Sequence, residues 1–280
     1  MGADDPRLAS NNKLDFRLSR MIGGWKREDP PPKRVKPIPV QVIWRIMFVA
    51  LQANDELVQA TADMTALGFF FLCRPGEYTD EAGEDACPFK IEDVQLFVGQ
   101  VRIDLDTATD GQIQCATFVT FTFTWQKNGV RGEVIGLGLS GDPYLCPVKS
   151  AVRRVLYARK HNFPKGTPLA RVRGRARVTS KRITDTLRTA VAYLGPSLGF
   201  LPDDVSARSL RAGGANALLL ARVDPDIISL IGRWRSDEML RYLHVQAAPL
   251  MADYSKRMLA AGTYNLLPGQ EVPTYEVPMY

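Results

Sequence analysis

The sequence lacks the residue patterns that hold a metal ion, a redox centre or a nucleoside triphosphate. Its 280 residues include only two histidines and four cysteines. Consecutive cysteines are 14, 28 and 31 positions apart, so no pair has CxxC spacing. No Gly-rich loop ending in Gly-Lys-Ser or Gly-Lys-Thr is present. We therefore expect no cofactor, and we interpret the cysteines as reduced, structural thiols of an intracellular protein.

Long apolar runs are scarce as well. The longest, from Met64 to Cys73, includes Thr65 and is about half the length of a membrane span. The first residues, Met-Gly-Ala-Asp-Asp-Pro, lack the basic start and apolar core of a secretory signal. We expect no membrane partner and an intracellular location, in the nucleus if the host is eukaryotic.

Positive charge is concentrated in the second half of the chain. Residues 1–144 carry 15 Lys and Arg against 20 Asp and Glu, whereas residues 145–257 carry 21 against 8. The overall composition, 45% hydrophobic and 24% charged, is typical of a globular protein with a sizeable core. A basic second half favours a polyanionic partner, first of all nucleic acid. A well-solvated surface is the alternative.

The spacing of apolar residues predicts a mainly helical chain. A short helix over 14–27 ends at three prolines, and a basic connector containing Lys33, Arg34 and Lys36 follows, so we expect a domain boundary near residue 36. Later helices are predicted over 40–53, 55–73, 147–161, 179–194, 206–221, 224–232, 235–245 and 248–261. The predicted organisation is a linker and helical remnant (1–36), a main domain (37–264) and a loose tail (265–280).

Between residues 91 and 139 the pattern changes to β structure. Residues 118–125 alternate aromatic or branched side chains with hydroxyl side chains, as in a half-buried strand. Lys127 precedes Asn128 and Gly129, a dipeptide that favours a hairpin turn, and 132–139 supplies the partner strand. The predicted fold class is α+β, mainly α with a small antiparallel sheet.

Four motifs occur in a specific order along the main domain. They are Arg74-Pro-Gly-Glu77 after an apolar helix, Lys127 in the hairpin turn, Arg208-Ser-Leu-Arg211, and the phrase from Gly232-Arg-Trp234 to Tyr242. Together they resemble the catalytic domain of the tyrosine recombinase (phage integrase) family. The last phrase is closest to the DIRS-like and crypton recombinases of eukaryotic mobile elements. Each motif alone would be a weak signal.

The resemblance implies a role for each of these residues. Tyr242 would be the nucleophile that forms a 3′-phosphotyrosyl link with DNA, because a phenolic oxygen makes a stable phosphodiester. Arg74 and Arg211 would stabilise the phosphorane, and Lys127 would protonate the leaving 5′-oxygen. Trp234 would occupy the family's His/Trp position. Glu77 completes the motif that begins at Arg74.

Plainer interpretations remain for the same residues. Arg74 could cap helix carbonyls, Lys127 could be a solvated turn residue, and Trp234 could be a core residue. Tyr254 is the alternative nucleophile. One position departs from the family pattern, because Arg208 stands where the family has a histidine, and arginine cannot accept a proton near neutral pH.

A further basic segment is predicted to contact DNA phosphates. The alternation within residues 171–177 would direct four guanidinium groups to one side of an extended loop, and the connector near residue 36 would add to them. The predicted DNA-binding residues are Arg171, Arg173, Arg175, Arg177, Lys181, Arg182, Lys33, Arg34 and Lys36. The resemblance also implies a homo-oligomer on DNA, joined through a C-terminal helix at 248–264.

The sequence thus leads to one preferred function and two alternatives. The preferred one is metal-independent cleavage and rejoining of duplex DNA, as in recombination or integration by a mobile element. The first alternative is a non-catalytic DNA-binding protein that retains the fold. The second is a topoisomerase IB-like enzyme, which the short linker and the single-domain size disfavour.

Overall fold

The computed structural model describes residues 15–16, 18–21, 35–81, 86–124, 131–234 and 253–263. The chain divides into two compact units, Met1–Arg34 and Val35–Tyr280. In the first unit, Phe16 and residues 18–21 are helical, within the helix predicted over 14–27. The second unit contains the sheet and the remaining described helices.

Helix α3 (Glu56–Phe70) lies at the centre of the second unit. Its start is fixed by Asp55, whose carboxylate accepts hydrogen bonds from the backbone N–H groups of Leu57 and Val58 at 2.8 and 2.9 Å. From Ala60 to its end the helix is buried on every side, because α2 (Val40–Gln52), α6 (Pro147–Lys160), α7 (Ser180–Leu198) and α8 (Ser209–Leu220) all contact it.

The end of α3 is a sharp turn that positions the first motif. Leu72 has φ 50°, a left-handed conformation that ends the helix, and the N–H of Cys73 donates back to the carbonyl of Gly68. Pro75 then begins the four-residue helix α4 (Pro75–Tyr78). Arg74 therefore stands between two helices, as the Arg-Pro sequence predicts.

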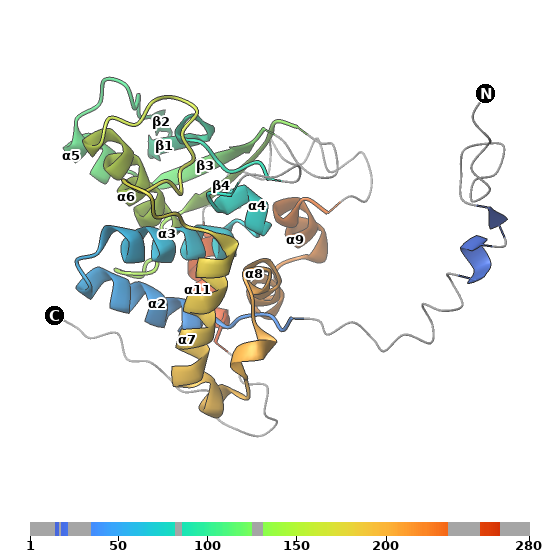
Figure 1. Cartoon of the computed structure of the whole chain (residues 1–280). Coiled ribbons are helices and arrows are strands. Elements are labelled where there is room, and N and C mark those ends of the chain that lie inside the picture. Colours follow the sequence, from blue (N-terminus) through green and yellow to red (C-terminus); the bar gives the residue numbers. More distant parts are fainter. Residues whose placement is uncertain are drawn as a thin grey trace, which may run out of the picture. The chain divides into compact units, whose positions relative to one another are not determined.

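A four-stranded antiparallel sheet covers one side of the helical body. Its strands, β1 (Val94–Val98), β2 (Val101–Arg102), β3 (Phe118–Phe123) and β4 (Glu133–Gly138), are ordered β2-β1-β3-β4. The predicted hairpin is formed by β3 and β4, with Phe123 opposite Glu133. Figure 1 shows the sheet, in green, at the top of the view, with α2 and α7 below it.

The aromatic side chains of β3 form the contact between sheet and helices. Phe121 and Phe123 are buried, and their rings lie 4.6 and 4.8 Å from the ring of Phe89. The ring of Phe71, at the end of α3, lies 4.7 Å from that of Phe121. The period-2 pattern thus marks a core-facing strand rather than a surface for stacking bases.

The other elements follow the predicted order with shifted ends. α7 continues four residues past its predicted end and stops at Gly199, which has φ 72°. α8 begins three residues late, because a turn in which Ser209 N–H donates to the Ser206 carbonyl precedes it. The remaining elements are η1 (Ile91–Asp93), α5 (Asp110–Gln114), η2 (Pro202–Asp204), α9 (Pro225–Gly232) and α11 (Tyr254–Ala261).

These elements confirm the predicted fold class at the level of a mixed α+β structure with a small antiparallel sheet. The helix predicted over 235–245 lies outside the described residues, and that over 248–261 is described only from residue 253. No helix in the described ranges has the length and hydropathy that crossing a bilayer requires.

Close packing of α8 on α3 depends on Gly214, three residues after Arg211. A Cβ added at Gly214 would overlap the backbone carbonyl oxygen of Phe69, which cannot move without disturbing α3. We expect Gly214→Ala to lower the free energy of unfolding by about 1–3 kcal/mol in urea titrations. Gly111→Ala in α5 is the control, since the added Cβ would lie 4.0 Å from the Thr109 hydroxyl oxygen, and it should not destabilise the protein. Equal stability of the two variants would contradict this packing.

Candidate functional site: an arginine cluster at the end of helix α3

Arginines from distant parts of the sequence meet at the turn after α3. Arg211, on α8, donates from Nη1 to the Leu72 carbonyl at 3.1 Å and from Nη2 to the Gly232 carbonyl. Arg74 donates its backbone N–H to Glu77 Oε2 at 2.7 Å, and its Nη1 lies 3.3 Å from Glu77 Oε1. The structure therefore brings together three of the predicted site residues, Arg74, Glu77 and Arg211.

A third arginine, Arg233, completes this cluster, and the sequence analysis assigned it no role. Its side chain is fully buried. It donates to the carbonyls of Phe71 and Leu72 at 3.0 and 3.2 Å and to Glu77 Oε2 at 2.9 Å. Its guanidinium carbon lies 3.6 Å from the centre of the Phe123 ring. The only signal in the sequence was its position between the two quoted residues of the Gly-Arg-Trp phrase.

The backbone of this phrase explains why Arg233 turns inward. Helix α9 ends at Gly232, and Arg233 has φ 58°, so the chain reverses there. A side chain at position 232 would collide with the ring of Trp234, which folds back over the glycine. The same ring lies 4.7 Å from the guanidinium carbon of Arg211 and remains 39% exposed. Trp234 thus covers the cluster and packs on an arginine.

Positive charge exceeds negative charge in the arginine cluster of Arg74, Arg211 and Arg233. Glu77 is the only carboxylate that the described residues pair with these guanidinium groups. Burial, followed by the charges of Arg233 and Arg74, lowers the pKa of Arg211 to about 10. The charged form of Arg211 is thus disfavoured by its surroundings, and a bound anion would relieve this repulsion. The cluster has the electrostatics of an anion site.

The other ionisable groups of this turn are inert. Burial raises the pKa of the Cys73 thiol, and Glu77 adds to the shift, so a thiolate does not form at neutral pH. Burial also raises the pKa of Tyr78, whose hydroxyl donates to the Ala207 carbonyl at 3.0 Å. This hydrogen bond ties α4 to the chain just before α8.

Arg208 lies apart from the hydrogen bonds of the cluster. It is exposed at the start of α8, where its backbone N–H donates to Ser206 Oγ at 3.3 Å. Tyr254, the alternative nucleophile, is 6% exposed on α11, and burial raises its pKa. A raised pKa makes a phenol harder to ionise, so Tyr254 is poorly suited to nucleophilic attack. The predicted site residues Lys127 and Tyr242, and Lys33 and Arg34 of the connector, lie outside the described residues.

The basic segment 171–177, here called the basic loop, differs from the predicted extended loop with four outward arginines. Arg171 and Arg177 face each other in an isolated antiparallel bridge, and Gly174 has φ 85° in the turn between them. Arg171 forms a two-pronged ion pair with the buried carboxylate of Asp80, at 2.6 and 3.0 Å. The guanidinium of Arg171 is therefore already paired within the protein. Of the four arginines predicted to face outward, three are exposed.

The remaining predicted DNA-binding residues are also at the surface. Arg173, Arg175 and Arg177 are exposed in the basic loop, and Arg182 is exposed in the first turn of α7. Lys181 pairs with Asp185 at 2.7 Å, and Lys36 pairs with Asp204 at 2.9 Å. The Lys181–Asp185 pair is exposed and opens at little cost, so Lys181 can still contact an anion, whereas the Asp204 side chain that pairs with Lys36 is only 13% exposed.

No protein-family model, curated protein or solved structure matches this sequence. What the site can do is therefore inferred from its geometry and its motifs.

The arginine cluster makes a prediction about stability. Arg233→Met would leave the buried carboxylate of Glu77 and the carbonyls of Phe71 and Leu72 short of donors, and we expect unfolding free energy to fall by about 3–5 kcal/mol. Arg233→Lys keeps the charge but not the planar fork, and should be intermediate. Arg208→Met is the matched control at an exposed arginine and should change stability little. Urea titration that ranks the three variants differently would contradict the structural role of Arg233.

Proposed function

We propose that this protein cleaves and rejoins duplex DNA by the tyrosine recombinase mechanism. The observation that carries the proposal is the convergence of Arg74 and Arg211, which are 137 positions apart in the sequence, on one partly buried site with excess positive charge. Phosphoryl transfer without a metal needs such a site, because guanidinium groups stabilise the charge that develops on the non-bridging oxygens.

In this proposal Tyr242 attacks the scissile phosphorus. The phenol of Tyr242 gives its proton to solvent, its oxygen forms a bond to phosphorus, the bond to the 5′-oxygen breaks, and that oxygen takes a proton from Lys127. Tyr242 lies eight residues after Trp234, which packs on Arg211, so an extended connection could reach about 27 Å. Lys127 lies four residues after Phe123, whose ring contacts Arg233. The length of the connecting chain thus allows both residues to reach the arginine cluster in this proposal.

A second candidate function is DNA binding without cleavage. The observation that favours it is the lack of a general base for Tyr242 among the described residues. The one histidine in the described ranges is His161, which lies 3.5 Å from Glu56 and away from the arginine cluster. Arg208 replaces the family's histidine and cannot act as a base. A protein of this kind would hold a phosphate in the cluster without activating Tyr242.

The nucleophile is tested with nicked suicide substrates whose sequence has first been found by selection. We expect Tyr242→Phe to abolish the covalent protein–DNA band in denaturing gels while DNA binding persists, because only the attacking oxygen is lost. Tyr254→Phe is the control and should keep the band. An adduct that survives in Tyr242→Phe and disappears in Tyr254→Phe would move the nucleophile to Tyr254.

The same assay separates the two candidate functions. Arg211→Gln should lower the cleavage rate by about two to three orders of magnitude, since it removes a charged donor from the transition state. A wild-type protein that binds the selected DNA and never forms the band would reject cleavage and leave the binding function.

The basic loop is tested by the dependence of DNA affinity on salt. Replacing Arg173, Arg175 and Arg177 with Gln should weaken binding to all duplexes alike and reduce the slope of log affinity against log salt by about 2–3 units. Arg171→Gln should leave the slope nearly unchanged, because its guanidinium is already paired with Asp80. A loss restricted to one DNA sequence would show that the loop reads bases instead.

A further inference from the structure

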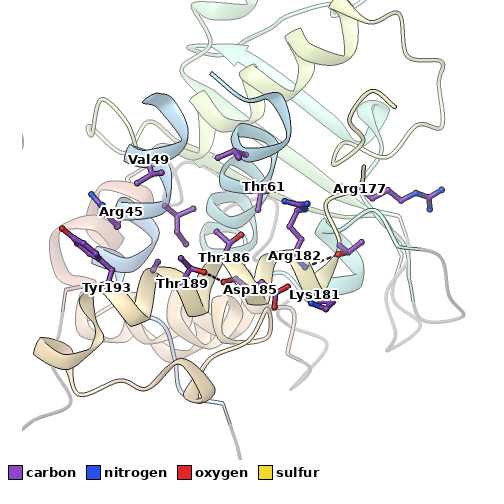
Figure 2. Close-up of a pocket in the computed structure, with 14 residues that line it drawn as sticks. Arg45, Val49, Thr61, Arg177, Lys181, Arg182, Asp185, Thr186, Thr189 and Tyr193 are labelled. Atoms are coloured by element: carbon purple, nitrogen blue, oxygen red, sulfur yellow. Dashed lines mark hydrogen bonds and ion pairs between the residues drawn. The ribbon is translucent and has the colours of Figure 1, made fainter. Parts of the chain in front are cut away.

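A groove of about 700 Å³ runs between helices α2 and α7 and is separate from the arginine cluster. Its apolar lining comes from Ile46, Val49, Val58 and Ala190. Arg45 and Tyr193 lie together at one end, and Lys181 and Arg182 lie towards the other (Figure 2). We call it the α2–α7 groove. Its volume is that of a ligand site, although it is open along its length.

Positively charged side chains outnumber negatively charged ones in the lining of the groove. Arg45, Arg177 and Arg182 have no carboxylate partner among the described residues, and the lining carboxylate, Asp185, is paired with Lys181 at 2.7 Å. The hydroxyl groups of Thr61 and Thr189 donate to carbonyls of their own helices. An occupant must therefore supply negative charge together with apolar surface.

One segment of this chain has that composition. Residues 264–280, here called the tail, contain Glu271 and Glu276 and no lysine or arginine, and between and around the two glutamates they carry mostly apolar and aromatic side chains. The described chain also ends beside the groove. The carbonyl of Gly262 accepts a hydrogen bond from the N–H of Val40 at 3.0 Å, at the first residue of α2.

The tail has the length to enter the groove from this point. Arg45 is five residues after Val40, which is about 7.5 Å along the helix axis. Seventeen tail residues span up to about 55–60 Å when extended. The groove residues Lys181 and Tyr193 are twelve positions apart on α7, about 18 Å. Glu271 and Glu276 would lie about 17 Å apart in an extended chain, so each could reach the cations of one end.

We propose that the tail of the same chain docks in the α2–α7 groove, with Glu271 at Arg45 and Glu276 at Arg182. The proposed function also assigns three groove cations, Arg177, Lys181 and Arg182, to DNA phosphates. The competition described next rests on that function. The docked tail then competes with DNA, and its release is required before these residues bind phosphate.

Docking is tested first without DNA, in the full 280-residue chain. Tyr275, between the two glutamates, is replaced with p-benzoylphenylalanine and irradiated, and the cross-linked peptides are identified by mass spectrometry. We expect links to residues of α2 or α7 that line the groove. In a mixture of isotope-labelled and unlabelled protein, the two linked peptides should carry the same label, because they come from one molecule. Arg45→Gln with Arg182→Gln should reduce the links at least fivefold, and Arg102→Gln with Lys165→Gln, two exposed cations outside the groove, should not. Links elsewhere, or links that join two molecules, would overturn the proposal.

Competition is tested by DNA affinity at low salt. Glu271→Gln with Glu276→Gln should tighten binding about fivefold or more, because the groove cations are released. Asp106→Asn with Asp110→Asn changes net charge equally outside the groove and should tighten it less than twofold. Equal gains in both double variants would reject competition. If no variant binds DNA, the proposed function fails, while the cross-links still decide where the tail docks.

Discussion

The carbonyl groups of the turn after helix α3 are the constraint on which the site depends. Within α3 the carbonyls of Leu67, Gly68 and Phe69 accept backbone hydrogen bonds from this turn. The carbonyls of the turn itself are buried, so they need donors from elsewhere in the chain. Here the carbonyls of Phe71 and Leu72 accept hydrogen bonds from Arg233, and Leu72 also accepts one from Arg211. Guanidinium groups suit this end of the helix dipole and supply several donors at once. The same bonds that satisfy this turn therefore bring α8 and the chain after α9 to Arg74.

The three arginines of the cluster differ in burial and in the contacts that they make. Arg233 is fully buried and bonded on several sides, so it holds the turn and Glu77 in place. Arg211 shares its donors between two carbonyls and lies against the face of Trp234, and burial followed by the charges of Arg233 and Arg74 lowers its pKa. Arg74 is one-third exposed and contacts Glu77 with one nitrogen at 3.3 Å. In the proposed function, Arg74 and Arg211 are therefore the groups that would contact an anion, and Arg233 holds the turn that positions them.

Local signals were enough to predict most elements but not the centre of the site. Asp55, the Arg-Pro step at 74–75 and the alternation in β3 each act within a few residues, so the α+β class could be read from sequence. Arg74 and Arg211 were found through their motifs. Arg233 was missed because its role comes from burial against Phe123 and Glu77, which are 110 and 156 positions away. Arg171 was misjudged for the same reason, since the alternation of charges does not reveal its partner Asp80.

The arginine cluster differs from the basic loop and the α2–α7 groove in the exposure of its charges. In the arginine cluster Arg233 is fully buried and Arg211 is partly buried, so salt screens their charges less than those of exposed cations. In the basic loop and the α2–α7 groove the cations are mostly exposed, so each contributes little, their sum depends on salt, and an acidic segment can displace a ligand from them. In the proposed control of DNA binding, the tail would therefore act at the exposed surface. The groove lining includes none of Arg74, Arg211 and Arg233, so the proposed docking would not use the cations of the arginine cluster.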